Sequence, residues 1–523
     1  MVQFFNGADF RLILPEVQLT LFALGILLTD FWLERREKYF NAVMALLGVA
    51  FSGLTLWGMP YRLVSFLERT KIGNFNLGRF AVPGLIRASS EAAKTTRPHL
   101  MDHTGSILID PFFIFFASIF LIATALVILL SVRYLDMEDE QEGEYYALVL
   151  FATVGMMFMA SGIDLIVQFI GLETMAISFY ILAGFLRRDR RSNEGALKYL
   201  LLGAFSSGIL AYGFSLMYGM SATTNIFGIA QGMARTGESG WLVFLAFATV
   251  AAGLFFKVAA VPFHQWAPDV YEGAPTSITA YLSVASKTAS FALLLRLFTT
   301  AFWPSNANWT YLVAGVAVAS LTLGNLAAIT QSNIKRLLAY SSISHVGYVL
   351  LGIVAGNETG MRGISFYLFA YAFMNIGAFA IVIILRRKGL IGDELDDLNG
   401  LYYRSPGAAV LLLIFMLSLA GIPPTAGFIG KYYIFLALIQ TGHTWLAVFA
   451  VLYIVPALYY YFRIVVHAWL RDPTDKVSIA ISPMQTVALT ATVLVTVVAG
   501  IYPEPFIRLA QYSVFLPFGA LGR

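Results

Sequence analysis

The sequence of 523 residues contains no cysteine. This absence excludes disulfides, thiolate catalysis and cysteine-bound iron–sulfur clusters within the chain. Charged residues are also scarce, at 12%, against about 25% in an average soluble domain. No hydrophilic stretch is long enough to form a nucleotide-binding domain, and no glycine motif of the phosphate-binding kind occurs. With 59% hydrophobic residues, the chain is expected to be an all-α polytopic membrane protein.

Hydrophobic windows of roughly 18–25 residues predict about fourteen transmembrane helices. The first window is read as a retained helix, because no small-residue cleavage site follows a short apolar core. The windows lie at 13–33, 40–59, 108–131, 145–161, 163–186, 197–219, 241–262, 276–301, 309–330, 337–355, 363–385, 406–437, 443–468 and 480–502.

The basic residues predict how these helices are oriented. Short loops after even-numbered helices contain almost none, whereas the loops after odd-numbered helices contain Arg35, Arg36, Lys38, Arg133, Arg187, Arg188, Arg190, Arg191, Lys335, Arg336, Arg386, Arg387, Lys388 and Arg471. Basic loops stay in the cytoplasm, so both termini are expected on the outer side of the membrane. The loop 60–107 is predicted to be external although it holds seven Lys and Arg, because long segments translocate regardless of charge. The net charge of +4 gives no indication of nucleic acid binding.

Two predicted helices are interrupted by proline, which removes a helix hydrogen bond and blocks the turn. Helix 7 reaches Pro262 soon after Lys257, and helix 12 contains Pro423 and Pro424 before Lys431. Broken helices five spans apart run in opposite directions, so they predict two inverted five-helix repeats, helices 4–8 and 9–13. The expected division of the chain is 1–140, 141–303, 304–470 and 471–523.

Five ionisable residues lie inside apolar spans: Glu173, Lys257, Lys287, His345 and Lys431. An ionised side chain at the bilayer centre costs at least ~2.5–3.5 kcal/mol, so such residues usually line an ion or proton path. Burial favours the neutral form of a lysine and brings its protonation into reach near neutral pH. Together the five residues predict a proton relay, with Glu173 paired with Lys257.

Each of these residues also has a simpler interpretation. Lys257 and Lys431 have stems long enough to reach an interface, whereas Lys287 lies about midway along its helix. Glu173 is alternatively a neutral, buried acid, and His345 a structural hydrogen-bonding group.

Further polar and aromatic residues are given structural roles. His264 is expected to cap the break after helix 7, and Arg296 and Arg463 to reach an interface or to pair helices. Tyr459, Tyr460 and Tyr461 are interpreted as packing residues rather than a quinone site.

Five stretches carry a resemblance to a known family, and they lie at 171–182, 190–199, 256–275, 340–352 and 417–431. They resemble the antiporter-like subunits of respiratory complex I, most closely the subunit N family of bacterial NADH:quinone oxidoreductase. Lysine at position 431 fits subunit N, whereas subunit M has glutamate there. The superfamily also includes subunits of cation/proton antiporters and membrane-bound hydrogenases.

The resemblance implies a proton-translocating subunit of a redox enzyme, with no redox centre of its own. Glu173 and Lys257 would be the paired charge switch, Lys287 the central relay, His345 a group on the polar axis, and Lys431 the lysine near the exit. NADH, FMN, iron–sulfur clusters and quinone would belong to partner subunits of the membrane and redox arms. Two alternatives stay open: a subunit of a sodium/proton antiporter, and a scaffold that only holds its neighbours.

Overall fold

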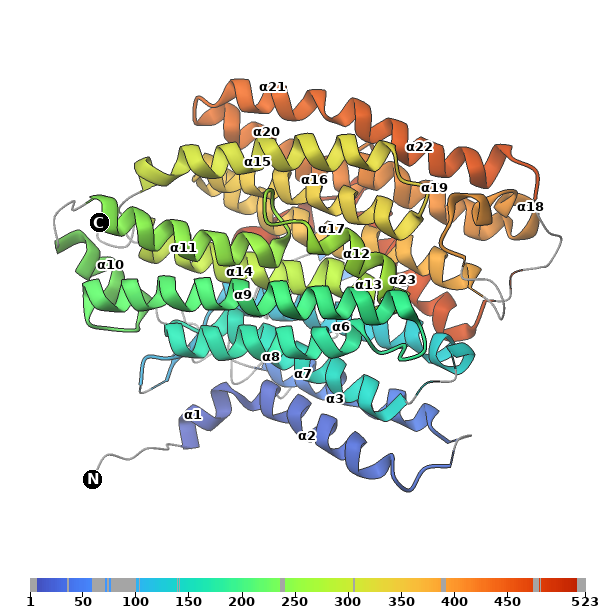
Figure 1. Cartoon of the computed structure of the whole chain (residues 1–523), viewed down its shortest axis with the longest axis horizontal. Coiled ribbons are helices and arrows are strands. Elements are labelled where there is room, and N and C mark those ends of the chain that lie inside the picture. Colours follow the sequence, from blue (N-terminus) through green and yellow to red (C-terminus); the bar gives the residue numbers. More distant parts are fainter. Residues whose placement is uncertain are drawn as a thin grey trace.

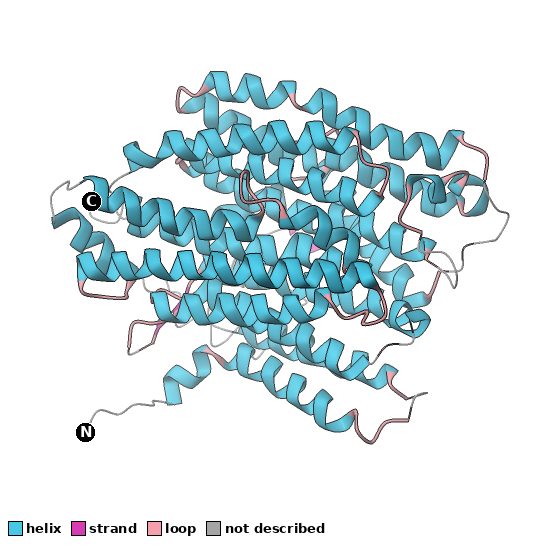
Figure 2. Ribbon diagram, in the orientation of Figure 1, coloured by secondary structure: helices cyan, strands magenta, loops and turns pink. Residues whose placement is uncertain are grey.

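The computed structural model describes residues 7–34, 37–58, 71–72, 75–76, 100–102, 104–138, 140, 142–235, 240–303, 306–386, 392–473, 479 and 481–514. Long helices run side by side along one common direction and form nearly all of this part of the chain (Figures 1 and 2). The all-α membrane architecture expected from composition is therefore confirmed. Most of the predicted external loop 60–107 lies outside the described residues.

Among the described residues, twelve helical segments are long and apolar enough to cross a membrane. They are formed by α3 (Tyr39–Gly58), α6 (Pro111–Glu138), α7 (Glu142–Ser161), α8 (Leu165–Ala183), α9 (Arg190–Ser221), α11 (Gly240–Val258), the continuous run α13 (Thr276–Tyr281), η2 (Leu282–Ser286), α14 (Lys287–Arg296) and η3 (Leu297–Ala301), α15 (Asn306–Ile329), α16 (Ile334–Ala355), α17 (Glu358–Leu385), α21 (Thr444–Leu452) with α22 (Ile454–Leu470), and α23 (Pro483–Ile501).

Three shorter apolar helices accompany them: α2 (Leu14–Thr29), α19 (Pro406–Ala420) and α20 (Ala426–Gln440). With α2, and with α19 and α20 as two halves of one span, the segments match the fourteen predicted windows. The number that crosses a membrane stays a prediction.

The remaining elements are short. They are the helices α1 (Gly7–Leu12), α10 (Ile226–Arg235), α12 (Trp266–Gly273), η5 (Leu395–Leu398), α18 (Leu401–Arg404) and α24 (Glu504–Tyr512), and the strands β1 (Lys71–Ile72), β2 (Phe75–Asn76), β3 (Leu100–Met101) and β4 (Leu108–Ile109). The strands form two antiparallel pairs, β1 with β2 and β3 with β4.

Three segments lie at the centre of the bundle. The run from α13 to η3 and helix α17 are buried along their whole apolar windows, and α16 is buried along nearly all of its window. Helices α3, α9 and α23 are far more exposed and lie on the outside. A helix surrounded by other helices is the place where a polar side chain can lie within a membrane away from lipid.

The two predicted helix breaks are present. Helix α11 ends at Val258, and Ala259 then has a positive φ of 60° before Pro262 and the short helix α12. Helix α19 ends at Ala420, and Gly421 has a φ of 87° before Pro423, Pro424 and α20. The similarity of the two breaks is compatible with the inverted repeats, which stay a prediction.

The central helix is irregular as well. Two π-helical segments occur in it, η2 directly before Lys287 and η3 directly after Arg296. Such segments are rare and are frequently found at functional sites.

Several basic loops lie together at one end of the bundle. Arg191, Lys335 and Arg386 line a single small pocket there, together with Asp189 and Asp393. This end, where α9 and α16 begin and α17 ends, is called the basic end below.

Candidate functional site

Lys257 lies in the last turn of α11, next to the break. Its side chain is 2% exposed. The ammonium donates hydrogen bonds to Ser207 Oγ at 3.2 Å and to the Tyr180 hydroxyl at 3.3 Å. The lysine therefore lies inside the bundle, held by two hydroxyls from α8 and α9, and does not extend to an interface.

Glu173 lies on α8 and is half-buried. It shares the outward stripe of this helix with Ile166, Ile170 and Ile177, each of which is more than half exposed. Its Oε1 is enclosed but makes no hydrogen bond with the part of the chain that the structure describes. No direct ion pair joins it to Lys257 in this structure, and the two groups interact only through charge at longer range.

Lys287 begins α14, at the point where the π-helical segment η2 ends. It is 3% exposed and donates a hydrogen bond to Ser342 on α16. Its ammonium lies 5.5 Å from the centre of the Tyr271 ring. Two buried polar atoms nearby, Thr288 Oγ1 and Asn375 Oδ1, make no hydrogen bond with the described residues; the Asn375 amide nitrogen donates to Ser283, one turn before Lys287. A buried polar atom needs a partner, so this region favours water.

His345 is on α16, one turn beyond Ser342. Its Nε2 lies 3.0 Å from the Tyr461 hydroxyl, and its Nδ1 hydrogen bonds with the Tyr367 hydroxyl. The hydrogen-bond partner of Lys287 thus lies one turn from His345 on the same buried helix.

Lys431 lies six residues into α20 and points back at the break. Its ammonium donates to the backbone carbonyls of Leu419 and Ala420 at 3.1 and 3.0 Å. These are the last carbonyls of α19, where the helix carries partial negative charge. The ammonium also lies 4.7 Å from the centre of the Tyr348 ring. Lys431 is 2% exposed, so it caps a helix end inside the bundle instead of extending to an interface.

The three lysines share one kind of environment. No ion pair joins any of them to a carboxylate among the described residues; hydroxyls, carbonyls and aromatic rings surround them. A hydroxyl, carbonyl or aromatic ring stabilises a charged ammonium less than a neighbouring carboxylate would. A hydroxyl can also hydrogen bond with the neutral amine, either as donor or as acceptor. This environment is suited to a group that gains and loses a proton.

Several tyrosines at the site were missed by the sequence interpretation. Tyr461 was expected only to pack, yet its hydroxyl contacts His345. Of its two neighbours, Tyr459 is exposed and Tyr460 donates to Asn325. Nothing in the local pattern of residues distinguishes Tyr461, because the contact depends on how α22 packs against α16.

Two arginines also differ in part from expectation. Arg296 is fully buried and pairs with Asp110 through two hydrogen bonds of 2.8 and 3.1 Å. The expectation that it reaches a membrane interface is therefore wrong, and the expectation that it pairs helices is confirmed. Arg463 donates to the backbone carbonyls of Ile329 and Gln331, which joins α22 to the end of α15.

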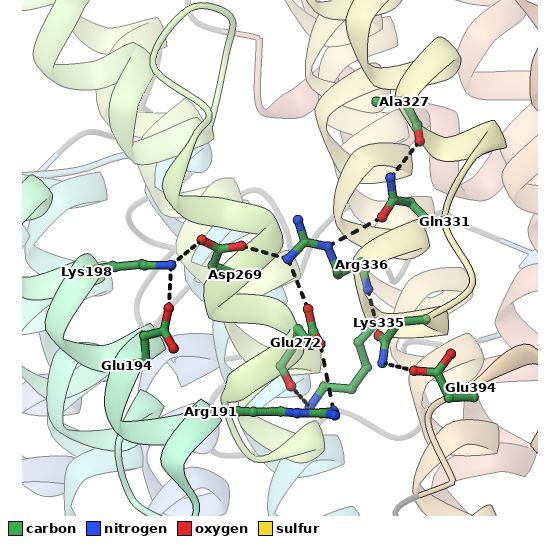
Figure 3. A network of polar contacts seen from close by, with 11 residues as sticks. Arg191, Glu194, Lys198, Asp269, Glu272, Ala327, Gln331, Lys335, Arg336 and Glu394 are labelled. Carbon is green, nitrogen blue, oxygen red and sulfur yellow. Dashed lines mark hydrogen bonds and ion pairs between the residues drawn. The ribbon is translucent and has the colours of Figure 1, made fainter.

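A charged network at the basic end positions the second half of the broken helix 7 (Figure 3). Asp269 of α12 accepts hydrogen bonds from Lys198 at 2.7 Å and from Arg336 at 2.6 Å. Glu272 contacts Arg336 as well, and its backbone carbonyl accepts from Lys335 at 2.6 Å. Partial burial raises the pKa of Asp269, but the hydrogen bonds from Lys198 and Arg336 outweigh it and hold the pKa below the ordinary 3.8. The network joins α9, α12 and α16.

A family described as "NADH:quinone oxidoreductase/Mrp antiporter, TM" matches residues 162–455, which include both broken helices and all five ionisable residues. NADH-quinone oxidoreductase subunit N 2 of Solibacter usitatus is 52% identical over 98% of this chain and 99% of its own length. The chain belongs to the subunit N family. A second member, subunit N 1 of Koribacter versatilis, is 50% identical over 98% of this chain and 96% of its own length.

Two solved structures share the fold of this chain. A chain of respiratory complex I from Thermus thermophilus is 29% identical, with a TM-score of 0.74 over 95% of this chain and 99% of that one. A chain of the Mrp complex from Dietzia sp. DQ12-45-1b has a TM-score of 0.75 at 20% identity, over 95% of this chain and 96% of that one. The second likeness shows a shared fold only. The resemblance found in the sequence is confirmed.

Among the described residues, no group of three or more His, Asp or Glu side chains is arranged to hold a metal ion.

Proposed function

We propose that this member of the subunit N family moves protons across the membrane through Glu173, Lys257, Lys287, His345 and Lys431. The energy would come from electron transfer from NADH to quinone in partner subunits. The chain would thus act as a translocating subunit of the enzyme without a redox centre of its own.

The observation that carries this proposal is the linkage between the buried groups. Lys257 is bonded to Tyr180, whose ring packs edge-on against that of Tyr199. Lys287 is bonded to Ser342, one turn before His345 on the same helix. The centre of the Tyr371 ring lies 5.1 Å from that of His345. Hydroxyls therefore lie beside Lys257, Lys287 and His345, and hydroxyls with water are the usual carriers of a proton between fixed sites.

Electrostatic coupling between Glu173 and Lys257 is the means by which protons would be driven along the relay. Two unit charges about 4 Å apart interact by about 4 kcal/mol at an effective permittivity near 20, and by less at greater separation. In this structure Glu173 and Lys257 do not form a direct pair. A movement that brings them together would favour the charged lysine, and one that separates them would release its proton.

The position of Glu173 also indicates a partner. A carboxylate on an outward stripe of isoleucines is unfavourable against lipid. We infer that another membrane-arm subunit covers this face of α8. NADH, FMN, iron–sulfur clusters and quinone would be bound by partner subunits, and the four divisions predicted from the sequence would assemble around this core.

The basic end is assigned to the cytoplasm, since basic loops are retained there. Both termini would then lie on the periplasmic side of a bacterial inner membrane. Protons would enter from the cytoplasm and leave outside, with Lys431 nearest the exit.

The decisive experiment replaces Lys287 with alanine in the intact assembly, in membrane vesicles. We expect NADH-driven proton uptake to be abolished while the assembly keeps its subunits, because the central protonatable group is removed. Lys38→Ala is the matched control, since Lys38 pairs with Asp30 near the surface and should leave pumping unchanged. Full pumping by the Lys287→Ala variant would refute the relay and favour a scaffold.

A sodium/proton antiporter subunit is the second candidate, favoured by the shared fold of the Mrp chain. It predicts that proton movement in vesicles needs sodium on the opposite side. The redox-driven function predicts instead that pumping persists without sodium and requires an electron donor.

A further inference from the structure

A cavity of about 320 Å³ lies between α2, α7 and α8. Its apolar walls are formed by Leu27 of α2, Leu148 and Phe151 of α7, and Ile181 of α8. The first three side chains are half-buried and Ile181 is 51% exposed, so the cavity opens on the outside of the bundle. Its volume lies within the range of small-molecule sites, which is about 300–1,000 Å³.

Two opposite charges border the same cavity at the basic end. Arg187 lies in the loop between α8 and α9, and Glu144 lies in the first turn of α7. Nη2 of Arg187 is 3.8 Å from Oε2 of Glu144, and the two side chains are 75% and 46% exposed. A charge-assisted hydrogen bond is shorter, about 2.7–2.9 Å, so the two groups are not locked onto each other.

The charged and apolar parts of the cavity follow one another along α7. Phe151 lies seven residues after Glu144, which places it about 10 Å further along the helix. The charges therefore lie at the end of the bundle where the loops are, and the apolar walls extend from there into the hydrophobic span. A phospholipid has the same order of parts, with a charged head group at the membrane surface and acyl chains below it.

The balance of charge at this mouth discriminates between head groups. A second carboxylate, Glu140, is close enough to Arg187 and Arg188 to interact with them through charge. A purely anionic head group would be repelled by the two carboxylates. A head group with a phosphate and a primary ammonium suits both signs, because the phosphate accepts from a guanidinium and the ammonium donates to a carboxylate. The quaternary ammonium of choline has no N–H group to donate.

We propose that this cavity binds one phospholipid whose head group carries a primary amine, as in phosphatidylethanolamine. Arg187 would hold the phosphate and Glu144 the ammonium, with an acyl chain against Leu148, Phe151 and Ile181. Ile181 continues the outward stripe of α8 that contains the other three isoleucines. The lipid would therefore lie at the edge of the surface on which we infer a partner subunit. The site does not depend on the proton translocation proposed above.

The test is photo-crosslinking of the intact assembly in phosphatidylcholine vesicles. Three lipid probes carry the same diazirine-bearing acyl chain on phosphatidylethanolamine, phosphatidylcholine or phosphatidylglycerol, and each is added separately at the same low fraction. Peptide mass spectrometry then locates the labelled residues. We expect residues 147–151 and Ile181 to be labelled more by the phosphatidylethanolamine probe than by the other two.

Two variants test the roles of the charged residues. Arg187→Gln should reduce labelling by the phosphatidylethanolamine probe about 2- to 5-fold, the range expected for an exposed ion pair. Glu144→Gln should reduce it similarly and should also abolish the preference over phosphatidylglycerol, because a repelling carboxylate is removed. A purely structural role of Glu144 would leave that preference unchanged. Glu504→Gln is the matched control, since it breaks the exposed pair with Arg508 on α24 and should leave labelling unchanged.

A third variant tests the apolar walls without touching the charges. Leu148→Trp should fill the cavity and abolish the labelling of Ile181. Its control is Leu494→Trp, which enlarges an exposed leucine on α23 and should leave the labelling as in the wild type. Unchanged labelling of Ile181 in Leu148→Trp would contradict an acyl chain in this cavity.

Two results in the wild-type assembly would overturn the proposal. Equal labelling by the three probes would show contact with bulk lipid only, and absence of labelling at the cavity walls would show that a partner subunit fills the cavity. The labelling does not require proton movement, so Lys287→Ala should be labelled like the wild type. Failure of the proton relay and failure of the lipid site are therefore distinguishable.

Discussion

Arg296 and Asp110 form a two-pronged ion pair inside the bundle, with hydrogen bonds of 2.8 and 3.1 Å. Arg296 ends α14, nine residues after Lys287, and Asp110 precedes α6 and accepts a hydrogen bond from the Phe113 amide. The arginine also donates to the Ala160 carbonyl at the end of α7. The pair thus fixes the central helix to two neighbours beyond the relay lysine.

The first prediction concerns this pair. Removing one partner of a buried ion pair costs about 3–5 kcal/mol, because a charge stays buried without its counter-charge. Asp110→Asn should therefore lower the thermal unfolding midpoint of the purified assembly clearly. Arg508→Ala is the control, since it breaks an exposed pair with Glu504, worth about 0–1 kcal/mol. Equal midpoints in the two variants would contradict the anchoring role.

The second prediction concerns Gly421, at the break that Lys431 caps. Gly421 has a φ of 87°, and a Cβ there would lie 3.0 Å from Cδ and 3.2 Å from Nζ of Lys431. Gly421→Ala should reduce proton uptake by displacing the lysine. Gly442→Ala is the control, because its φ is 79° but its Cβ would meet no atom of the described residues within 4 Å. Both changes cost about 1–2 kcal/mol of backbone strain, so loss of pumping in both would assign the effect to strain alone.

The third prediction concerns the pH dependence of the charged network on α12. The pKa of Asp269 is lowered below 3.8, mainly by Lys198 and Arg336 against the opposing effect of burial. A lowered pKa means that the carboxylate stabilises the folded state above about pH 3.8, and that this stability is lost as the pH falls through the folded value. Asp269→Asn should lower the thermal midpoint at pH 7, and the difference from the wild type should shrink below pH 3.8. A difference that is constant with pH would show that the carboxylate charge does not contribute.

The fourth prediction concerns the contact between α7 and α8, the helix that carries Glu173. A Cβ on Gly155 would lie 2.5 Å from the Met175 amide nitrogen and 2.6 Å from the Gly171 carbonyl oxygen. Backbone atoms cannot move aside without shifting the helix, so Gly155→Ala should cost about 1–3 kcal/mol. Its thermal midpoint should fall. Gly208→Ala should show no loss, because no described atom lies within 4 Å of the new Cβ. Similar midpoints in both variants would show that α7 and α8 can move apart to accept the added methyl group without loss of stability.

Much of the fold could be predicted because it depends on properties of short segments. Apolar windows match the observed helices closely; the window 276–301, for example, coincides with the run from α13 to η3. Pro262, Pro423 and Pro424 predicted both breaks because proline acts on its own turn of helix. The inverted repeats and the four divisions of the chain stay predictions.

Of the candidate site, only the set of ionisable residues could be predicted from the sequence. Their position in apolar windows is visible in the chain, since a charge within a span is unfavourable wherever it occurs. Their partners are not visible, because Tyr180, Ser342 and Tyr461 are ordinary residues of their own helices. The expected pair of Glu173 and Lys257 shows the same limit. Lys257 is buried in the bundle, whereas Glu173 lies half-buried on the outward stripe of α8, and no direct ion pair joins them in this structure.

The sequence by itself determined that this chain is a membrane bundle with broken helices and five ionisable groups in its spans. Hydropathy and proline are local, so these features follow from the order of residues alone. Only the tertiary structure decided which groups meet: Lys431 with the end of α19, Arg296 with Asp110, and His345 with Tyr367 and Tyr461. Tyr461 lies 116 residues from His345 along the chain. Contacts of that kind depend on how helices pack and rotate against one another, which the apolar pattern of each helix does not specify.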